Sequence, residues 1–174
     1  GRPFRISRIR ASRPEPGLKA QHLTAVKAFL ALFASKANGA VPGSPELEFF
    51  PGPPAKSRLD IDVGTAGSVT LLLQSLLPAL LHARRRFRLT LKGGTDVAWS
   101  PTWDFVTLAH APFLRRYGSL ECRLARRGYY PAGGGEVHVS VGGERSLGAP
   151  FSLAAPAKPM AVEGVAHAHV DLEA

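Results

Sequence analysis

The stretch DVGTAGSVTLLLQSLLPALLHA at residues 62–83 joins a turn of small residues to the most apolar run of the chain. The run at 69–81 is shorter than the ~20 apolar residues that span a bilayer. It is also too long for a typical strand, so we predict a buried helix. Apolar and acidic residues alternate over 59–63, which predicts a short strand entering the turn at 64–68.

Two residues interrupt the apolar character of this predicted helix. Gln74 is a polar amide among leucines, and Pro78 follows it by one helical turn. A proline in a helix has no N–H for the carbonyl four residues earlier, which here belongs to Gln74. Position 74 therefore offers an amide and a free carbonyl to a ligand, or else the amide bonds a neighbouring loop. From the residues alone the second interpretation is favoured, because buried polar groups usually have structural partners.

The order of predicted elements repeats along the chain. After the long helix come a strand at 87–91, a turn at 93–96, a helix from Ser100-Pro101 to about Tyr117-Gly118, and strands at 120–124 and 137–141. With the strand at 59–63 this is a β-α-β-α-β-β unit. Earlier, we predict a strand at 4–10, a helix at 18–35 stopped by Asn38-Gly39, and a strand pair formed by Val41 and 46–50. These match the second half of the unit. The predicted fold class is α/β, an α+β sandwich of repeated units with the first unit incomplete.

This repeat predicts three regions. Residues 1–54 form the incomplete first repeat, which ends at the Pro-Gly-Pro-Pro cluster of 51–54, and residues 55–142 form the complete repeat. Residues 143–174 begin a further unit or a linker and include one more expected strand, Met160–Val165. The chain starts without methionine and directly in a strand pattern, so we expect a fragment.

The composition favours a polyanionic partner. Lys and Arg number 22 against 13 Asp and Glu, the formal charge is +9, and the pI is about 10.4. Nucleic acid or a nucleotide comes first among such partners, although arginine-rich composition also arises from coding bias. The single cysteine, Cys122, allows no internal disulfide, which fits a reducing compartment. With no apolar signal segment at the N-terminus, we expect a cytoplasmic location and no membrane contact.

Basic residues surround a rigid, proline-containing loop near the N-terminus. Arg8, Arg10 and Arg13 precede Gln21 and His22, which lie at the expected start of a helix. Guanidinium groups and helix-end amides are suited to binding phosphate. The alternative, favoured by spacing alone, is a solvated basic edge with His22 on the inner face of the helix.

Two glycine-containing loops are further candidates. Small residues at 64–68 precede a helix and could hold an anion, but neither nucleotide-binding glycine fingerprint is present. The segment RGYYPAGGG at 127–135 places Tyr130 beside glycines, where a tyrosine can stack on a base. A hairpin loop with a packed aromatic is the commoner outcome.

Metal and nucleophile patterns are weak. His167 and His169 share a strand face without a third ligand at useful spacing, so no metal site is predicted within the chain. Cys122 alternates with leucines and should point into the core. Asp60 and Asp62 share a face and suggest a solvated strand edge rather than an acid/base pair.

Four ordered segments together resemble the RNA 3′-terminal phosphate cyclase family. They are IRASRPEPGL at 9–18 continuing to QHL at 21–23, TAGSV at 65–69 with LQ at 73–74, KGGTD at 92–96, and RGYYPAGGGE at 127–136. The resemblance covers nearly the whole chain, from about Pro3 to Val165.

The resemblance implies an ATP-dependent ligase that acts on RNA 3′-phosphate ends with a divalent metal, Mg²⁺ or Mn²⁺. The family adenylylates a histidine, passes AMP to the RNA 3′-phosphate, and forms a 2′,3′-cyclic phosphate. By resemblance, Gln74 and Pro101 contact ATP, and Arg13, Gln21 and His22 support catalysis. Arg10 and Tyr130 are expected to make further nucleotide or RNA contacts.

Departures from the family pattern qualify this expectation. Ser12 replaces the usual glycine of the first motif, and the family's opening glycine-rich segment is absent. The nucleophilic histidine belongs to a C-terminal motif that this chain does not contain, so we expect the chain alone to be inactive. The alternatives are a non-catalytic cyclase-like protein of ribosome assembly that binds RNA and, less favoured, a related enolpyruvyl transferase. The oligomeric state stays open.

Overall fold

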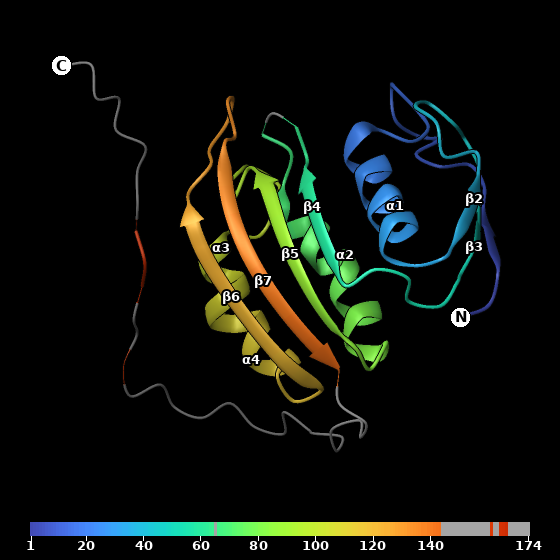
Figure 1. Ribbon diagram of the computed structural model, residues 1–174. Helices are drawn as coiled ribbons and strands as arrows, with labels where there is room; N and C mark the ends of the chain where they lie inside the picture. Colours follow the sequence, from blue (N-terminus) through green and yellow to red (C-terminus); the bar gives the residue numbers. More distant parts are fainter. Residues whose placement is uncertain (65, 144–160, 162–163, 167–174) are drawn as a thin grey trace.

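A computed structural model describes residues 1–64, 66–143, 161 and 164–166 and contains two β-sheets (Figure 1). The smaller sheet is antiparallel, has the order β1-β3-β2, and comprises β1 (Phe4–Ile6), β2 (Lys36–Asn38) and β3 (Leu47–Phe50). The larger sheet has the order β4-β5-β7-β6 and comprises β4 (Arg58–Asp62), β5 (Arg86–Gly93), β6 (Gly118–Arg126) and β7 (Gly135–Gly143). Only its β4–β5 pair is parallel.

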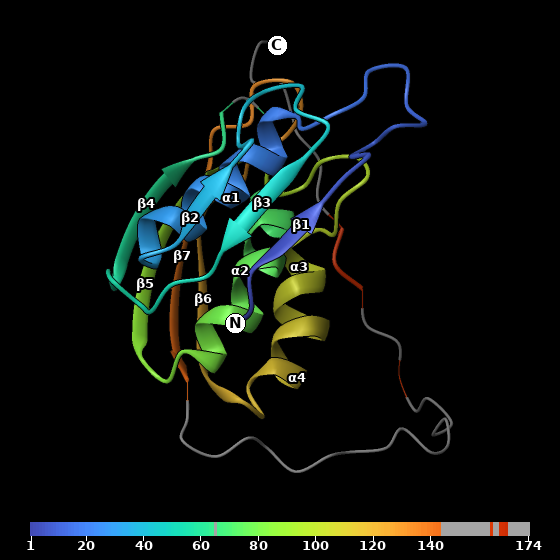
Figure 2. The same cartoon turned by 90° about the vertical axis from the view of Figure 1, so that its right-hand side faces the viewer.

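The helices pack against one face of the larger sheet. They are α1 (Ala20–Leu32), α2 (Val69–His82) and a continuous segment of α3 (Trp103–Phe105), the π-helix η1 (Val106–His110) and α4 (Ala111–Leu114). Figure 2 shows α2, α3 and α4 on the same side of the larger sheet, and Figure 1 shows α1 between α2 and the smaller sheet. The predicted α+β sandwich is confirmed.

The core lies between α2 and the larger sheet, as the sequence pattern requires. Alternate residues of β5 and β7 point inward, and the apolar side of α2 covers them. The largest fully buried side chains include Phe87, Leu89, Leu91, Val137, Leu72, Leu73, Leu76, Leu77 and Leu80. Truncating one such leucine to alanine typically costs about 2–5 kcal/mol of unfolding free energy.

The element order confirms the repeat. The segment from β4 to β7 is β-α-β-α-β-β, and the earlier segment β1-α1-β2-β3 matches its second half. The sheet order β1-β3-β2 also matches β5-β7-β6. The boundaries proposed for the three regions stay a prediction.

The first predicted strand is shorter than expected. It ends at Ile6 rather than residue 10, because Arg8 and Arg10 adopt left-handed backbone conformations with φ of 55° and 52°. These turns are closed by hydrogen bonds from Ala11 N–H to the Arg8 carbonyl (3.1 Å) and from Arg13 N–H to the Arg10 carbonyl (3.0 Å).

Two further boundaries were wrong in the first unit. The helix predicted at 18–35 covers only Ala20–Leu32. The strand predicted around Val41 is instead β2, where Ala37 pairs with Phe49. The prediction followed apolar residues, whereas β2 is a short and largely polar edge strand.

The second helix of the complete unit starts later and ends earlier than predicted. Its N-cap is Thr102, whose hydroxyl accepts a hydrogen bond from Phe105 N–H at 3.1 Å, and not Ser100. It ends at Leu114 rather than near residue 117. Half of the strand expected at Met160–Val165 lies outside the described residues, and the three described residues of that range, 161, 164 and 165, are not in a strand. His167 and His169 also lie outside the described residues.

Candidate functional site

Three loops meet beyond the C-terminal ends of the parallel strands β4 and β5. The turn that precedes α2 touches the turn that follows β5: Gly94 N–H donates to the Gly67 carbonyl (2.8 Å), and Val69 N–H donates to the Gly94 carbonyl (2.9 Å). A Cβ on Gly94 would lie 2.7 Å from the Ala66 carbonyl oxygen. Glycine is therefore required at this position because the two backbones approach so closely.

The third loop joins β6 to β7 and packs on the same turn. Thr95 N–H donates to the Gly128 carbonyl (2.8 Å), and Gly128 N–H donates to the Thr95 hydroxyl (2.9 Å). A Cβ on Gly128 would lie 2.3 Å from the Gly93 carbonyl oxygen. The GGTD and RGYY motifs are thus two sides of one backbone junction.

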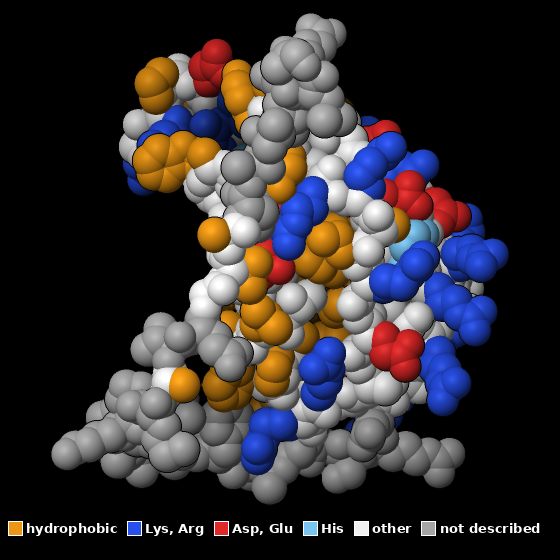
Figure 3. Space-filling view, turned by 90° about the vertical axis from the view of Figure 1, so that its left-hand side faces the viewer, with side chains coloured by type: hydrophobic (Ala, Val, Ile, Leu, Met, Phe, Trp, Pro, Cys, Tyr) orange, Lys and Arg blue, Asp and Glu red, His pale blue; other side chains and the backbone are white. Residues whose placement is uncertain are grey.

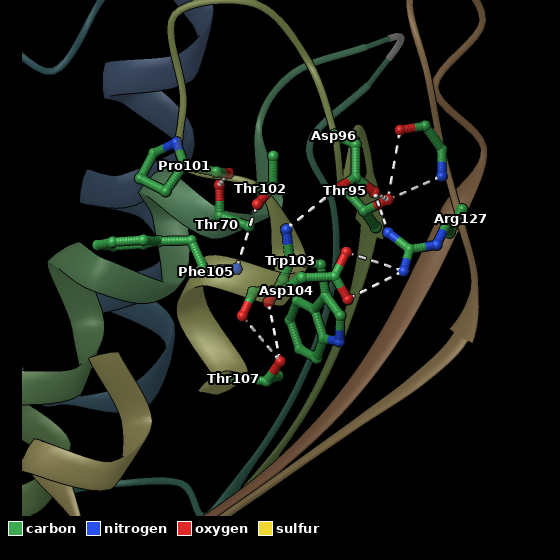
Figure 4. A network of polar contacts seen from close by, with 11 residues as sticks. Thr70, Thr95, Asp96, Pro101, Thr102, Trp103, Asp104, Phe105, Thr107 and Arg127 are labelled. Atoms are coloured by element: carbon green, nitrogen blue, oxygen red, sulfur yellow. Dashed lines mark hydrogen bonds and ion pairs between the residues drawn. The ribbon is translucent and has the colours of Figure 1, made fainter. Parts of the chain in front are cut away.

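An ion network fixes this junction to α3 (Figure 4). Arg127 lies 3.0 Å from an Asp96 oxygen and 2.9 Å from an Asp104 oxygen. The other Asp96 oxygen accepts from Trp103 N–H at 3.1 Å, and Thr95 donates to Asp96 at 2.6 Å. The hydrogen bond to Asp104 is the main cause that raises the pKa of Arg127. Burial acts in the opposite direction, and the hydrogen bond and charge of Asp96 raise the pKa further. These contacts hold the loops in place.

Gln21 joins the first unit to the start of α2. Its amide nitrogen donates to the Ser68 carbonyl (2.8 Å), and its amide oxygen accepts from Ser68 N–H (3.0 Å). The Ser68 hydroxyl caps α2 by accepting from Leu71 N–H at 3.1 Å. Gln21 therefore positions the N-terminus of α2.

A cavity of about 490 Å³ lies beside this contact. Its lining residues are Gln21, Ala66, Ser68, Leu71, Val97, Ala98, Trp99, Ser100 and Tyr130. Two of them are large aromatics in water: Trp99 is 100% exposed and Tyr130 is 81% exposed. Exposed rings beside a cavity are suited to stacking on a nucleobase. The sequence reasoning identified Tyr130 but missed Trp99, although a tryptophan among small residues directly after the GGTD turn was a usable signal.

The predicted ATP contacts lie near this cavity but do not line it. The Pro101 carbonyl accepts from the Thr70 hydroxyl (2.8 Å), which places Pro101 next to the lining residue Ser100. Gln74 lies one turn beyond Leu71 on α2 and is half-buried. Within the described part of the chain its side chain has no hydrogen-bond partner, so the favoured structural interpretation of this amide finds no support.

The two arginines of the basic loop differ in their contacts. The Arg10 guanidinium donates to the carbonyls of Glu15 (2.6 Å) and Gly17 (3.4 Å) and thereby shapes its own loop. Arg13 is exposed, and no described residue forms an ion pair or hydrogen bond with its guanidinium. Neither residue lines the cavity.

His22 is exposed on the first turn of α1 and does not cover the inner helix face. Its Nδ1 accepts a hydrogen bond from Lys19 N–H at 3.0 Å, so a neutral ring carries its proton on Nε2. Partial burial, and then the charge of Arg10, lower the pKa of His22. It does not line the cavity, and its catalytic role stays a prediction.

The described residues do not form a metal site by themselves. Among them no group of three His, Cys, Asp or Glu is placed to hold an ion, and Asp96 and Asp104 are bound by Arg127. None of the described helices has the length and apolarity needed to cross a membrane.

The chain is similar in sequence to a known family and to several named proteins. Residues 1–166 match the model of a family described as RNA 3′-terminal phosphate cyclase. Proteins with that name are similar to this chain: one from Saccharolobus islandicus (strain L.S.2.15 / Lassen #1) at 46% identity over 170 residues, 96% of this chain and 49% of its own length. One from Saccharolobus solfataricus is 44% identical over 170 residues, with the same coverage of 96% and 49%. One from Methanosarcina acetivorans is 47% identical over 138 residues, 79% of this chain and 39% of its own length. The chain spans about half the length of the curated relatives it matches.

Proposed function

This chain belongs to the RNA 3′-terminal phosphate cyclase family, and from this premise we propose that it forms the part of an ATP-dependent cyclase that holds the nucleotide and the RNA 3′ end. The observation that carries the proposal is the cavity at the start of α2, where Trp99 and Tyr130 present exposed rings beside Ser68. The relatives described above bear the cyclase name, which favours the catalytic over the non-catalytic interpretation.

The proposed reaction has three displacements. An enzyme histidine attacks the α-phosphate of ATP and pyrophosphate leaves. The RNA 3′-phosphate then attacks the adenylylated histidine, takes AMP and frees the ring. Finally the neighbouring 2′-hydroxyl attacks the 3′-phosphorus, AMP leaves, and the 2′,3′-cyclic phosphate forms. The nucleophilic histidine has no counterpart among the motifs of these 174 residues, so we expect this chain alone not to become adenylylated.

The hydrogen bonds of α2 favour assigning the cavity to a base rather than to phosphate. The N–H groups of Ser68, Val69, Leu71 and Leu72 already donate to protein acceptors. They are therefore not available to bind an anion, although the helix dipole still favours negative charge nearby. Stacking on the exposed rings of Trp99 and Tyr130 is an interaction that the cavity offers to a base.

We propose that Arg13 binds phosphate. Its exposed guanidinium has a fork of donors suited to phosphate oxygens. Any divalent cation, Mg²⁺ or Mn²⁺, would arrive bound to the ATP phosphates. Gln74, whose side-chain amide has no hydrogen-bond partner among the described residues, is proposed to hydrogen-bond the nucleotide.

Intrinsic fluorescence tests the base assignment on this chain directly. Of the two tryptophans, Trp99 is fully exposed, whereas Trp103 is 3% exposed and serves as an internal reference. Titration with ATP, or with an oligoribonucleotide ending in a 3′-phosphate, should quench the emission of Trp99. The quenching should vanish in Trp99→Phe and persist in Trp103→Phe. Saturable binding without quenching in the unchanged chain would contradict the assignment.

A further inference from the structure

The face of the larger sheet that points away from the helices is strongly charged. In Figure 3, Lys and Arg side chains gather along the right-hand edge of the view, over this outer face. At the end where β5 finishes, basic and acidic groups are balanced: Lys92 lies 3.6 Å from Glu136, and Glu136 lies 3.2 Å from His138. At the other end of the face, no ion pair joins the basic side chains to an acidic one among the residues that the structure describes.

Three exposed arginines, Arg58, Arg86 and Arg88, lie where β4 and β5 begin. Among the described residues none of their guanidinium groups has an ion pair or a hydrogen bond. Arg58 and Arg88 are direct partners in the parallel register, and Arg86 is on the same face of β5 as Arg88. Like charges directly opposite each other destabilise a sheet, so their presence here points to an anionic ligand. We call these three residues the arginine patch.

The surface at the arginine patch is hollow. A cavity of about 550 Å³ is lined by the three arginines together with Ser57, Ser119, Ser140 and Glu121. Guanidinium forks bind phosphate oxygens in a bidentate manner, and serine hydroxyls add further donors. The single aromatic residue in the lining, Phe87, is 1% exposed. With no ring available for stacking, the chemistry is that of phosphate contacts and not of base recognition.

We propose that the arginine patch binds the phosphate backbone of single-stranded RNA. This rests on the proposed function, because the strand would be the substrate whose 3′ end lies at the cavity of Trp99 and Tyr130. The patch lies at the opposite end of β5 from that cavity, and the distance from Arg88 to Gly94 is ~20 Å at ~3.3 Å per residue. At the stacked rise of ~3.4 Å per nucleotide, an RNA of about six nucleotides covers this distance, so a dodecamer is long enough to reach both places.

Fluorescence anisotropy with labelled RNA tests the proposal. A trimer and a dodecamer, each with a 3′-phosphate or a 3′-hydroxyl, are titrated with the 174-residue chain at several salt concentrations. The test variant is Arg58→Ala/Arg86→Ala/Arg88→Ala. The matched control is Arg2→Ala/Lys27→Ala/Lys36→Ala, which removes the same charge from exposed positions of the first unit.

The expected result follows from counterion release. Each phosphate contact on a single strand adds ~0.7 to the slope of log K against log salt, so three contacts are worth ~2 in slope and about 100-fold in affinity near 0.1 M salt. The patch variant should lose this affinity for the dodecamer and keep that of the trimer, while the control changes by less than about threefold. Equal losses in both variants, an equal loss for the trimer, or no loss would overturn the proposal.

Two additional measurements keep the outcome clear. Circular dichroism checks that the variants fold; if the triple variant does not, Arg88→Gln alone should lower the slope by ~0.7. Whether RNA binding depends on the 3′-phosphate tests the proposed function. If RNA with a 3′-hydroxyl binds equally well, the proposed function is contradicted but the assignment of the arginine patch is not. If the patch variant binds RNA as tightly as the unchanged chain but no longer binds anionic vesicles, the patch binds a lipid surface and the RNA proposal is wrong.

Discussion

Gln21 and Ser68, which are 47 residues apart in the sequence, exchange two hydrogen bonds that join α1 to the N-terminus of α2. Each end of the Gln21 amide meets one backbone group of Ser68. This pairing couples the first unit to the complete unit at the wall of the proposed nucleotide cavity.

Gln21→Ala should therefore destabilise the fold as well as the site. It leaves the part-buried Ser68 N–H without the Gln21 acceptor, which costs about 1–3 kcal/mol. The Ser68 carbonyl loses the Gln21 donor but keeps the hydrogen bond from Leu72 N–H (3.3 Å). Urea unfolding followed by circular dichroism measures the loss. Thr24→Ala on the same helix removes only an exposed bond to the Ala20 carbonyl (3.0 Å) and should cost less than about 0.5 kcal/mol. Equal stability of Gln21→Ala and Thr24→Ala would contradict the coupling.

Arg127→Met should be among the more damaging single changes near the site. It leaves the Asp96 side chain, which is 4% exposed, and the Asp104 side chain, 22% exposed, without their cation. Breaking a buried pair costs about 3–5 kcal/mol, and the partial exposure of Arg127 and Asp104 places the expected loss nearer to 2–3 kcal/mol.

The double variant Arg127→Met/Asp96→Asn separates charge from packing. It removes the negative charge of Asp96 that Arg127 no longer neutralises, and it should recover part of the stability lost in Arg127→Met in equilibrium unfolding. Arg123→Met, an exposed change on β6, which ends one residue before Arg127, is the control and should stay within about 0.5 kcal/mol. A double variant no more stable than Arg127→Met would show that the charge of Asp96 is not the cause.

The larger sheet and α2 were predictable because their residues follow clear periods. Inward residues alternate along β5 and β7, and α2 comes from an apolar run that is too long for a typical strand. The turn at Arg8 and Arg10 was not predictable, since neither left-handed position holds a glycine. The short strand β2 exists through its pairing with β3, for example Ala37 with Phe49, and carries no strong pattern of its own.

The candidate site was predictable in its parts but not in its assembly. The motifs identified Gln21, Tyr130 and Pro101, yet no periodicity relates residue 21 to residue 68 or places Tyr130 beside Trp99. Such contacts depend on how the two units pack. The outer-face arginines could be read as exposed from their alternation along β5, but their lack of acidic partners depends on the register of β4 against β5.

Cys122 should be protected from thiol reagents in the folded chain. Burial raises its pKa from 9.0 to about 11, although Arg115 opposes the shift. At pH 8 the thiolate fraction in the folded chain is therefore about 100-fold below that in the unfolded chain, and alkylation by iodoacetamide should be slower by a similar factor than in urea.

The pH dependence of stability follows with a definite sign. The folded state binds the Cys122 proton more tightly, so this contribution is fully present below pH 9.0 and is lost as the pH rises towards about 11. Cys122→Ser or Cys122→Ala should remove this part of the alkaline destabilisation in denaturant titrations. Rapid labelling of the folded chain at pH 8 would show that the thiol is accessible and ionised.

Gln74→Ala should separate nucleotide binding from stability. The amide is half-buried on α2 and has no hydrogen-bond partner among the described residues, so its removal should change the unfolding free energy by less than about 0.5 kcal/mol. If the amide hydrogen-bonds the nucleotide, the lost hydrogen bond is worth about 0.5–1.5 kcal/mol, or about 2- to 12-fold in the Kd for ATP.

Titration calorimetry on the chain measures that Kd. Ser75→Ala is the neighbouring control, because its hydroxyl already donates to the Leu72 carbonyl at 2.7 Å; it should leave ATP binding unchanged. If Gln74→Ala binds ATP as tightly as Ser75→Ala, the assignment of Gln74 to the nucleotide is wrong.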